Sequence, residues 1–262
     1  MELGLKDKAA LVMASSDGIG RGVALEFARE GANVMLFARR EDKLKEVRDE
    51  IKAVTGREAG FLAGDITQPE DIGKVVDKTI SEFGPVYALF NNTGGPPAGT
   101  FEKFDDNDWR TAFDLTLLSY IRGIRAVLPS MKENGGGRIL NVTSSSVKLV
   151  LDNLILSNTF RMGIVGLSKS LASELGQYNV LINVLGPGKI LTDRVEHLDS
   201  IRSERAGLPK DEYQKKVQQG IPLGRYGQPE EFARLAVFLC SAANSYISGQ
   251  TLLVDGGMVK AY

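Results

Sequence analysis

The chain is poor in the residues that build disulfides, metal sites and hydrolytic triads. Its 262 residues include a single cysteine, Cys240, so no disulfide can form within the chain. The single histidine, His197, leaves little scope for a His-rich metal site or a Ser-His-Asp triad, and we predict no metal site. Asp193 lies one helical turn before His197, but we do not expect this pair to be catalytic.

Long apolar runs and a strong net charge are also missing. No stretch approaches the roughly 18 apolar residues of a membrane span. The N-terminal sequence MELGLKDKAALVM places its charges before a strand-length apolar run, unlike a secretory signal. A formal net charge of -1 argues against a general nucleic-acid surface. We therefore expect a cytoplasmic protein without a membrane or nucleic-acid partner.

What remains is an ordinary globular composition, 43% hydrophobic and 25% charged, with β-rich runs and helical patterns in alternation. Strands are predicted at Lys8–Ala14, Asn33–Ala38, Ala59–Gly64, Val86–Asn91, Gly137–Ser144, Val180–Leu185 and Thr251–Val254. Helices are predicted at Gly18–Glu30, Glu41–Val54, Pro69–Phe83, Asn107–Lys132, Ser157–Gln177 and Pro229–Leu239. This βαβ order predicts an α/β fold, in which one doubly wound domain (residues 1–262) has a parallel seven-stranded sheet covered by helices on both faces.

The segment 187–227 breaks this alternation. It is long, polar and charged, with one helical pattern at Lys210–Gln219. It follows the carboxyl end of a predicted strand, where ligands collect in open α/β sheets. Because long irregular insertions in compact domains are usually functional, we predict a substrate lid here.

The first predicted strand ends in a glycine-bearing turn, ASSDGIGRG, and a helical pattern follows. Glycines at such a turn let backbone N–H groups approach a phosphate, and the helix N-terminus favours the anion. The alternative is a plain turn that needs glycine for packing, but its place in a repeating βαβ chain favours a dinucleotide site. The residues that we assign to this site are Ala14, Ser15, Ser16, Asp17, Gly18, Ile19 and Gly20.

The second strand ends in MLFARRED, and its last residues bear on the choice of coenzyme. NAD-binding sites commonly place an acidic residue there for the ribose, whereas an arginine accommodates a 2′-phosphate. Ala38 holds the acidic position and Arg39 follows, which favours NADP(H) over NAD(H). Asp17 argues the other way, unless Arg39 or Arg40 pairs with its carboxylate.

The stretch RILNVTSSSVKLVLDNLILSNTFRMGIVGLSKSLA resembles the catalytic strand and helix of the short-chain dehydrogenase/reductase family. The glycine turn resembles that family's Thr-Gly-x-x-x-Gly-x-Gly turn, with Met13 and Ala14 in place of Thr and the first Gly. Alanine is the smallest substitute, so we expect the turn to survive if Ala14 avoids a positive φ. The resemblance covers essentially the whole chain, in its 3-oxoacyl-acyl-carrier-protein reductase-like branch.

Three further motifs support this resemblance. GDIT resembles the acidic element after the third strand, NNTGG the Asn-Asn-Ala-Gly element after the fourth, and NVLGPGKILT the segment that covers the nicotinamide. The resemblance implies coenzyme contacts by Asp65, Ile66, Asn91, Asn92, Thr93, Gly94, Pro187, Gly188, Ile190 and Thr192.

The resemblance also implies a catalytic set, but with unusual residues. The family has a serine, a tyrosine thirteen residues later and a lysine four residues after that. Here Ser144 is followed at those spacings by Ser157 and Arg161, and Thr116 stands where the family has an asparagine. Ser145 and Ser146 leave the register open by one residue, although the spacing selects Ser144. Arg161 would also contact the coenzyme ribose.

The replacements change the chemistry that is available. A phenol with a pKa near 10 can be brought into working range by a cation, whereas the hydroxyl of Ser157 is much less acidic. Arg161 can bind ribose or a substrate anion but cannot act as a base. Lys148 and Lys189 are alternative proton donors, and the competing interpretation is that both are solvated loop lysines. Tyr120 and Tyr178 are predicted to be packing or interface aromatics.

The predicted function is oxidation or reduction of a carbonyl/alcohol pair by hydride transfer, on a small-molecule substrate. The alternative is a dinucleotide-binding protein with impaired catalysis, acting as a sensor or a structural subunit. The family resemblance implies a homo-oligomer, a tetramer or a dimer, formed through the helices at Asn107–Lys132 and Ser157–Gln177. Gly163 and Gly166 suit close helix packing in a core or in such an interface.

Overall fold

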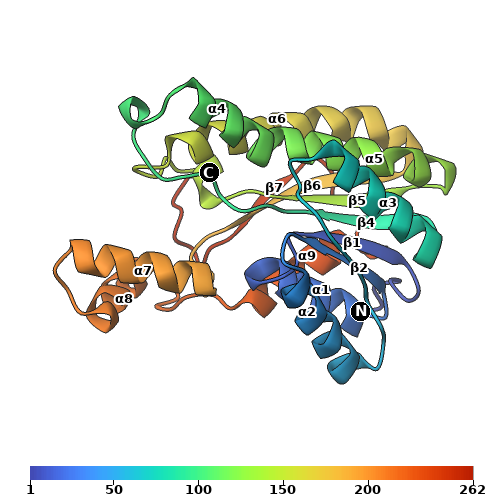
Figure 1. Ribbon diagram of the computed structural model, residues 1–262, viewed down its shortest axis with the longest axis horizontal. Helices are drawn as coiled ribbons and strands as arrows, with labels where there is room; N and C mark the ends of the chain where they lie inside the picture. Colours follow the sequence, from blue (N-terminus) through green and yellow to red (C-terminus); the bar gives the residue numbers. More distant parts are fainter. Residues whose placement is uncertain (262) are drawn as a thin grey trace.

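Seven parallel strands form the centre of the molecule, in the order β3-β2-β1-β4-β5-β6-β7 (Figure 1). The computed structural model describes residues 1–261. The strands are β1 Ala9–Met13, β2 Asn33–Ala38, β3 Gly60–Ala63, β4 Val86–Asn91, β5 Gly137–Val142, β6 Val180–Pro187 and β7 Thr251–Val254. Consecutive strands are placed to the two sides of β1, so the order reverses between β1 and β4. Ligands bind at such a reversal in doubly wound folds.

Helices cover both faces of the sheet, as predicted. Their bounds are α1 Gly18–Arg29, α2 Glu41–Thr55, α3 Pro69–Phe83, α4 Asp106–Phe113, α5 Ser119–Glu133, α6 Ile155–Leu175, α7 Asp193–Arg205, α8 Lys210–Gln219 and α9 Pro229–Leu239. Figure 1 shows α1, α2 and α9 on one side of the sheet and α3, α5 and α6 on the other.

The core lies in two layers, one on each face of the sheet. The residues of β1, AALVM, are all buried, and alternate ones belong to different layers. Ala10 and Val12 pack with α1 and α9, whereas Leu11 and Met13 pack with α3 and α5. A strand covered on both faces must be apolar throughout, and this is why VYALFN was recognisable as the central strand β4.

The long helix predicted at Asn107–Lys132 is divided in the structure. Helix α4 ends at Phe113, a π-helical turn spans Asp114–Leu118, and α5 begins at Ser119. Within this turn the hydroxyl of Thr116 donates to the carbonyl of Ala112, four residues earlier. Such hydroxyls compete for backbone carbonyls and are associated with bends.

Helix α7 was not predicted. Its sequence, DRVEHLDSIRSER, carries few apolar residues, so no periodic apolar stripe marks it. The structure instead shows charge and capping signals: Thr192 accepts from the N–H of Val195, while acidic residues occupy the first turn and arginines the last. Helices α7 and α8 contact each other and project from one end of the sheet (Figure 1).

Among residues 1–261, no helix combines the length and the apolar character that crossing a membrane requires.

Candidate functional site

A cavity of about 750 Å³ opens at the carboxyl ends of the central strands. Its walls come from the turn after β1, the loop after β4, the end of β5, the first two turns of α6, the segment after β6, and α7. The cavity therefore lies at the reversal of strand order and extends towards the inserted helices.

The glycine turn forms one end of this cavity. Asp17 caps α1 by accepting from the N–H of Gly18 at 2.7 Å. Gly20 has no room for a side chain, because a Cβ there would lie 2.1 Å from the carbonyl oxygen of Ala14. The turn thus brings the N-terminus of α1 against the strand end, as a phosphate site requires.

Ala14 has a positive φ, which the sequence analysis expected it to avoid. Its φ is +51°, in the left-handed region. This conformation costs an L residue roughly 1–2 kcal/mol. The turn survives with alanine because the surrounding structure holds it there.

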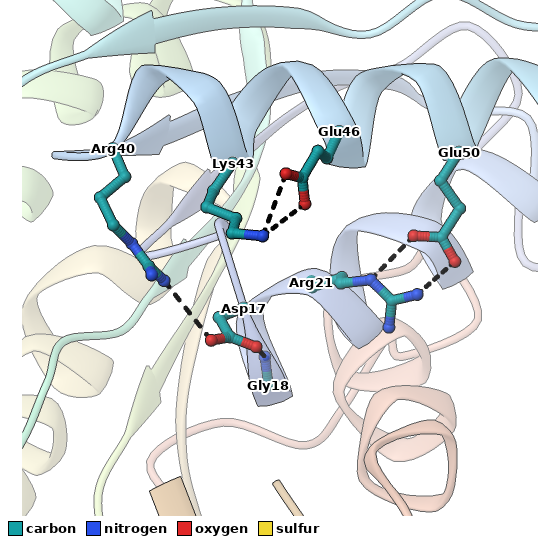
Figure 2. A network of polar contacts seen from close by, with 7 residues as sticks. All are labelled: Asp17, Gly18, Arg21, Arg40, Lys43, Glu46 and Glu50. Atoms are coloured by element: carbon teal, nitrogen blue, oxygen red, sulfur yellow. Dashed lines mark hydrogen bonds and ion pairs between the residues drawn. The ribbon is translucent and has the colours of Figure 1, made fainter. Parts of the chain in front are cut away.

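Asp17 also pairs with Arg40, the second of the two arginines that follow β2. Arg40 Nη2 lies 3.4 Å from Asp17 Oδ2, and both side chains are about half exposed, at 54% and 49%. Figure 2 shows the two groups facing each other across the start of α1 and the start of α2. The ion pair reduces the repulsion that the Asp17 carboxylate would exert on a phosphate.

A second ion pair fixes α2 against α1. Arg21 Nε donates to Glu50 Oε2 at 2.8 Å, and Arg21 Nη2 also contacts the same carboxylate (Figure 2). Lys43, between these two contacts, bonds to Glu46 on its own helix. Arg40 is therefore held near the glycine turn by an anchored helix rather than by a free loop.

Ser144, Ser157 and Arg161 form the other end of the cavity. Ser144 ends the segment after β5 and accepts from the N–H of Ser146 at 3.1 Å. Because a hydroxyl both donates and accepts, the proton of Ser144 remains available for another acceptor. Ser157 and Arg161 are one helical turn apart on α6 and are 7% and 6% exposed. The spacing that selected Ser144 thus brings these three residues to one cavity.

Arg161 is held by the last carbonyl of β5. Its Nη1 donates to the Val142 oxygen at 3.0 Å, and the hydroxyl of Tyr120 donates to the same oxygen at 2.7 Å. Burial raises the pKa of Tyr120, against the opposing influence of the Arg161 charge. The phenol is completely buried, so it packs beside Arg161 as predicted and does not line the cavity.

Two buried hydroxyls on the cavity wall fit a polar ligand. Thr93 Oγ1 and Thr143 Oγ1 are both buried without a hydrogen-bond partner among the described residues. A buried hydroxyl without a partner is costly, and a ligand rich in hydroxyl and phosphate oxygens would satisfy both. Together with the glycine turn, this wall fits the predicted dinucleotide.

The structure brings most of the predicted residues to this one cavity. Those that line it are Ala14, Asp17, Gly18, Ile19, Gly20, Asn92, Thr93, Gly94, Ser144, Ser157, Arg161, Pro187, Gly188 and Thr192. Those that do not line it are Ser15, Ser16, Arg39, Asp65, Ile66, Asn91, Thr116 and Ile190.

Several residues of the second group have structural partners instead. Asn91 is buried and donates to the Tyr120 carbonyl and to Asn141. The carboxylate of Asp65 accepts from the N–H and the hydroxyl of Thr67, both at 2.8 Å. Ile190 belongs to the hydrophobic core, and Thr116 is fully buried in the π-helical turn.

Neither lysine that we considered as a proton donor lines the large cavity. Lys189 instead borders a separate cavity of about 70 Å³. Burial lowers the pKa of Lys189, and the charge of Arg202 lowers it further. Lys148 follows the short helical turn after Ser144 and is exposed.

Several lining residues were not among the predicted site residues: Gly95, Pro96, Pro97, Ala98, Val142, Thr143 and Leu154, and three more on the unpredicted helix α7. Arg194, Leu198 and Arg202 follow one another at intervals of four residues and all line the cavity. This spacing places them on one face of a helix. This four-residue spacing would have indicated that Arg194, Leu198 and Arg202 share a face if the helix α7 had been predicted.

Comparisons with known proteins agree with this geometry. Residues 13–259 match the family described as Enoyl-(Acyl carrier protein) reductase. The chain is 33% identical to 3-oxoacyl-[acyl-carrier-protein] reductase FabG of Chlamydia muridarum, over 97% of this chain and 98% of that protein.

Two solved structures extend the comparison. L-sorbose reductase from Gluconobacter frateurii, complexed with NADPH and L-sorbose, superposes with a TM-score of 0.95 at 32% identity, covering 100% of both chains. A 7α-hydroxysteroid dehydrogenase complexed with NADH and 7-oxo glycochenodeoxycholic acid gives 0.90 at 34% identity, over 99% of this chain and 97% of that one.

Proposed function

The chain belongs to the short-chain dehydrogenase/reductase family, and on that premise we propose that it is a nicotinamide-dependent oxidoreductase that interconverts a carbonyl and an alcohol. One observation carries the proposal: a single cavity joins the glycine turn before α1 to Ser144, Ser157 and Arg161. Such a cavity can place a dinucleotide and a small substrate side by side.

The residues at the glycine-turn end would hold the coenzyme. The N–H groups of Ile19 and Gly20, in the first turn of α1, would bind the pyrophosphate, and the hydroxyls of Thr93 and Thr143 would bind polar groups further along. When bound, the coenzyme supplies or accepts the hydride at the carbonyl carbon.

The residues at the other end would stabilise negative charge on the substrate oxygen and transfer a proton to it. Ser144 Oγ keeps its proton for that oxygen, since it accepts from Ser146. The Arg161 guanidinium stabilises developing negative charge but stays protonated. Ser157 Oγ–H can pass a proton to an alkoxide of similar basicity and regain one from water. A catalytic set of Ser144, Ser157 and Arg161 thus replaces the phenol and lysine of the family pattern.

We propose NADP(H) as the preferred coenzyme. Arg40 pairs with Asp17 and offers its remaining donors at the end of β2, beside the exposed Arg39. Positive charge at this strand end suits a ribose 2′-phosphate. The related structures contain NADPH in one case and NADH in the other.

We further propose that α7 and α8 act as the substrate lid and that α4–α6 form a homo-oligomer interface. Arg194, Leu198 and Arg202 of α7 line the cavity. On α6, a Cβ at Gly163 would press on Leu117 of the same chain, whereas one at Gly166 would meet no described atom within 4 Å. Gly166 therefore leaves a flat surface for a neighbouring subunit.

The second candidate function is a dinucleotide-binding sensor or structural subunit with impaired catalysis. The observation that favours it is the absence of any tyrosine, lysine, histidine or glutamate among the described residues that line the cavity. Loss of a positioned acid typically lowers a rate by about 10²–10⁴-fold.

Calorimetry with NADPH and NADH, followed by coenzyme consumption over a panel of ketones and aldehydes, tests both functions. We expect binding, and turnover that falls at least tenfold in Ser144→Ala with coenzyme affinity unchanged. Binding without turnover on any carbonyl would favour the sensor. Absence of binding by folded protein would contradict both.

A further inference from the structure

The charge of the large cavity is strongly unbalanced. Its lining includes four arginines, Arg40, Arg161, Arg194 and Arg202, and one acidic residue, Asp17. Asp17 is paired with Arg40. Between described residues, none of the other three arginines forms an ion pair. An excess of positive charge that the protein does not neutralise itself calls for an anion in the cavity.

Helix α7 presents this charge to the cavity through an exposed residue, Arg194, and a half-buried one, Arg202. A helix that covers a core normally presents an apolar stripe, but the residues of α7 that line the cavity are Arg194, Leu198 and Arg202, and its buried residues are Asp199 and Ser203. Burial of its guanidinium and the charge of Arg161 lower the pKa of Arg194. A guanidinium still remains protonated, so the repulsion between these two cations persists until an anion enters.

Arg161 and Arg194 approach the cavity from different elements. Arg161 comes from α6, is only 6% exposed, and donates a hydrogen bond to the Val142 carbonyl. Arg194 comes from α7 and lies against the loop after β4, where a Cβ on Gly95 would be 2.9 Å from its Nη2. Each guanidinium has five N–H donors, so most donors remain for a ligand.

We propose that the substrate carries an oxyanion, a carboxylate or a phosphate, bound by Arg161 together with Arg194, while Leu154 and Leu198 contact its apolar part. This inference rests on the proposed function, because it names the substrate class of the same site. The substrate is then a keto acid or hydroxy acid, or the phosphate ester of a ketone or alcohol.

The coenzyme phosphates do not account for Arg161. A pyrophosphate at Gly18–Gly20 lies after β1, and a 2′-phosphate near Arg40 lies after β2, towards the β3 edge of the sheet. Arg161 instead shares its end of the cavity with Ser144 and Ser157, beyond β4 and β5. This is the end at which the carbonyl would react.

Matched pairs of charged and neutral ketones test the inference. Phenylpyruvate and pyruvate are compared with their methyl esters, and dihydroxyacetone phosphate with dihydroxyacetone. We expect the charged member of at least one pair to bind and react with an affinity about 10- to 100-fold above its neutral partner. The carboxylate and phosphate pairs distinguish the two oxyanions. Equal affinity for both members of every pair would overturn the inference.

Arg194→Met then separates charge from shape, because it keeps an unbranched stem of similar length. We expect it to lower affinity for the charged member about tenfold more than affinity for the neutral one, and Arg194→Lys to restore part of the preference. Arg205→Met, on the exposed last turn of α7, is the matched control and should retain it. Equal losses for charged and neutral ketones would indicate an opened lid and contradict oxyanion binding.

Calorimetric titration with NADPH separates this inference from the proposed function. If the coenzyme binds and neutral ketones are reduced without charge preference, the function stands and the oxyanion site is refuted. If no coenzyme binds, the proposed function fails, while titration of wild type and Arg194→Met with phosphate and pyruvate alone still decides the anion site.

Discussion

At the scale of single residues, the glycine turn holds one alanine in a conformation that suits glycine. Ala14 has a φ of +51° next to the carbonyl that Gly20 approaches. We predict that Ala14→Gly stabilises the protein by about 1 kcal/mol, since relief of strain exceeds the added entropy of the unfolded chain. Urea unfolding measures this change. Ala10→Gly, in the buried strand β1, is the control and should destabilise; the same sign for both variants would refute the strain.

Coenzyme preference also depends on a single residue. Arg40 forms an ion pair with the Asp17 carboxylate. We predict that Arg40→Ala weakens NADPH binding by about tenfold, because it removes a charge-assisted contact and leaves Asp17 unpaired beside the phosphate. Binding of NADH should change little. Fluorescence titration with the two coenzymes checks this, and equal losses for both would show that Arg40 does not read the 2′-phosphate.

The predicted residues that line the cavity come from motifs that fix backbone geometry, and those that do not line it are residues whose burial no motif determines. Gly18, Gly20 and Ser144 line the cavity because each follows a strand end. Thr116 and Asn91 were assigned by position in a motif, yet the structure buries both among internal partners. No local pattern distinguishes a polar residue that faces a cavity from one that faces a neighbouring helix.

At the scale of secondary-structure elements, a buried polar network joins two strands to two helices. Asn91 on β4 donates to Asn141 on β5 at 3.2 Å, and Asn141 donates to Ser168 on α6 at 2.9 Å. We predict that Asn141→Ala destabilises the protein by about 1–3 kcal/mol, because it leaves buried groups without partners. Thermal unfolding checks this. Asn107→Ala, at an exposed position of α4, should have a much smaller effect, and equal effects would contradict the network's role.

Elements whose apolar pattern comes from contact with the sheet were predicted within one or two residues. Strands β2, β4 and β7 have the predicted bounds, and so do α3 and α9. Helix α7 was missed because it faces an aqueous cavity, so its inner face carries arginines. Periodicity of apolar residues reports burial and cannot reveal a helix that faces water on both sides.

At the scale of the whole molecule, one buried thiol makes the stability of the folded protein depend on pH. Cys240 is completely buried after α9, and burial raises its pKa to about 12 from a reference value of 9.0. The folded state therefore retains a proton that the unfolded state releases above pH 9. Stability contributed by this thiol is full below pH 9 and is lost as the pH rises from 9 towards 12.

We predict that Cys240→Ala is less stable than wild type at pH 7 but loses less stability between pH 9 and 11. The variant has a lower free energy of unfolding at pH 7 because the alanine side chain fills less of the buried space than the cysteine. Urea unfolding at several pH values measures the difference between the two proteins. A constant difference across this range would show that the thiol does not ionise on unfolding.

Because the Asp17–Arg40 pair is half exposed, stability of the fold and choice of coenzyme depend on different residues. Packing of the sheet and its helices depends on buried residues, whereas the coenzyme preference that we propose depends on two half-exposed side chains. Exchanges at these two positions alter little of the core. Selection can therefore adapt the enzyme to whichever reducing equivalent a cell keeps abundant, and leave its scaffold unchanged.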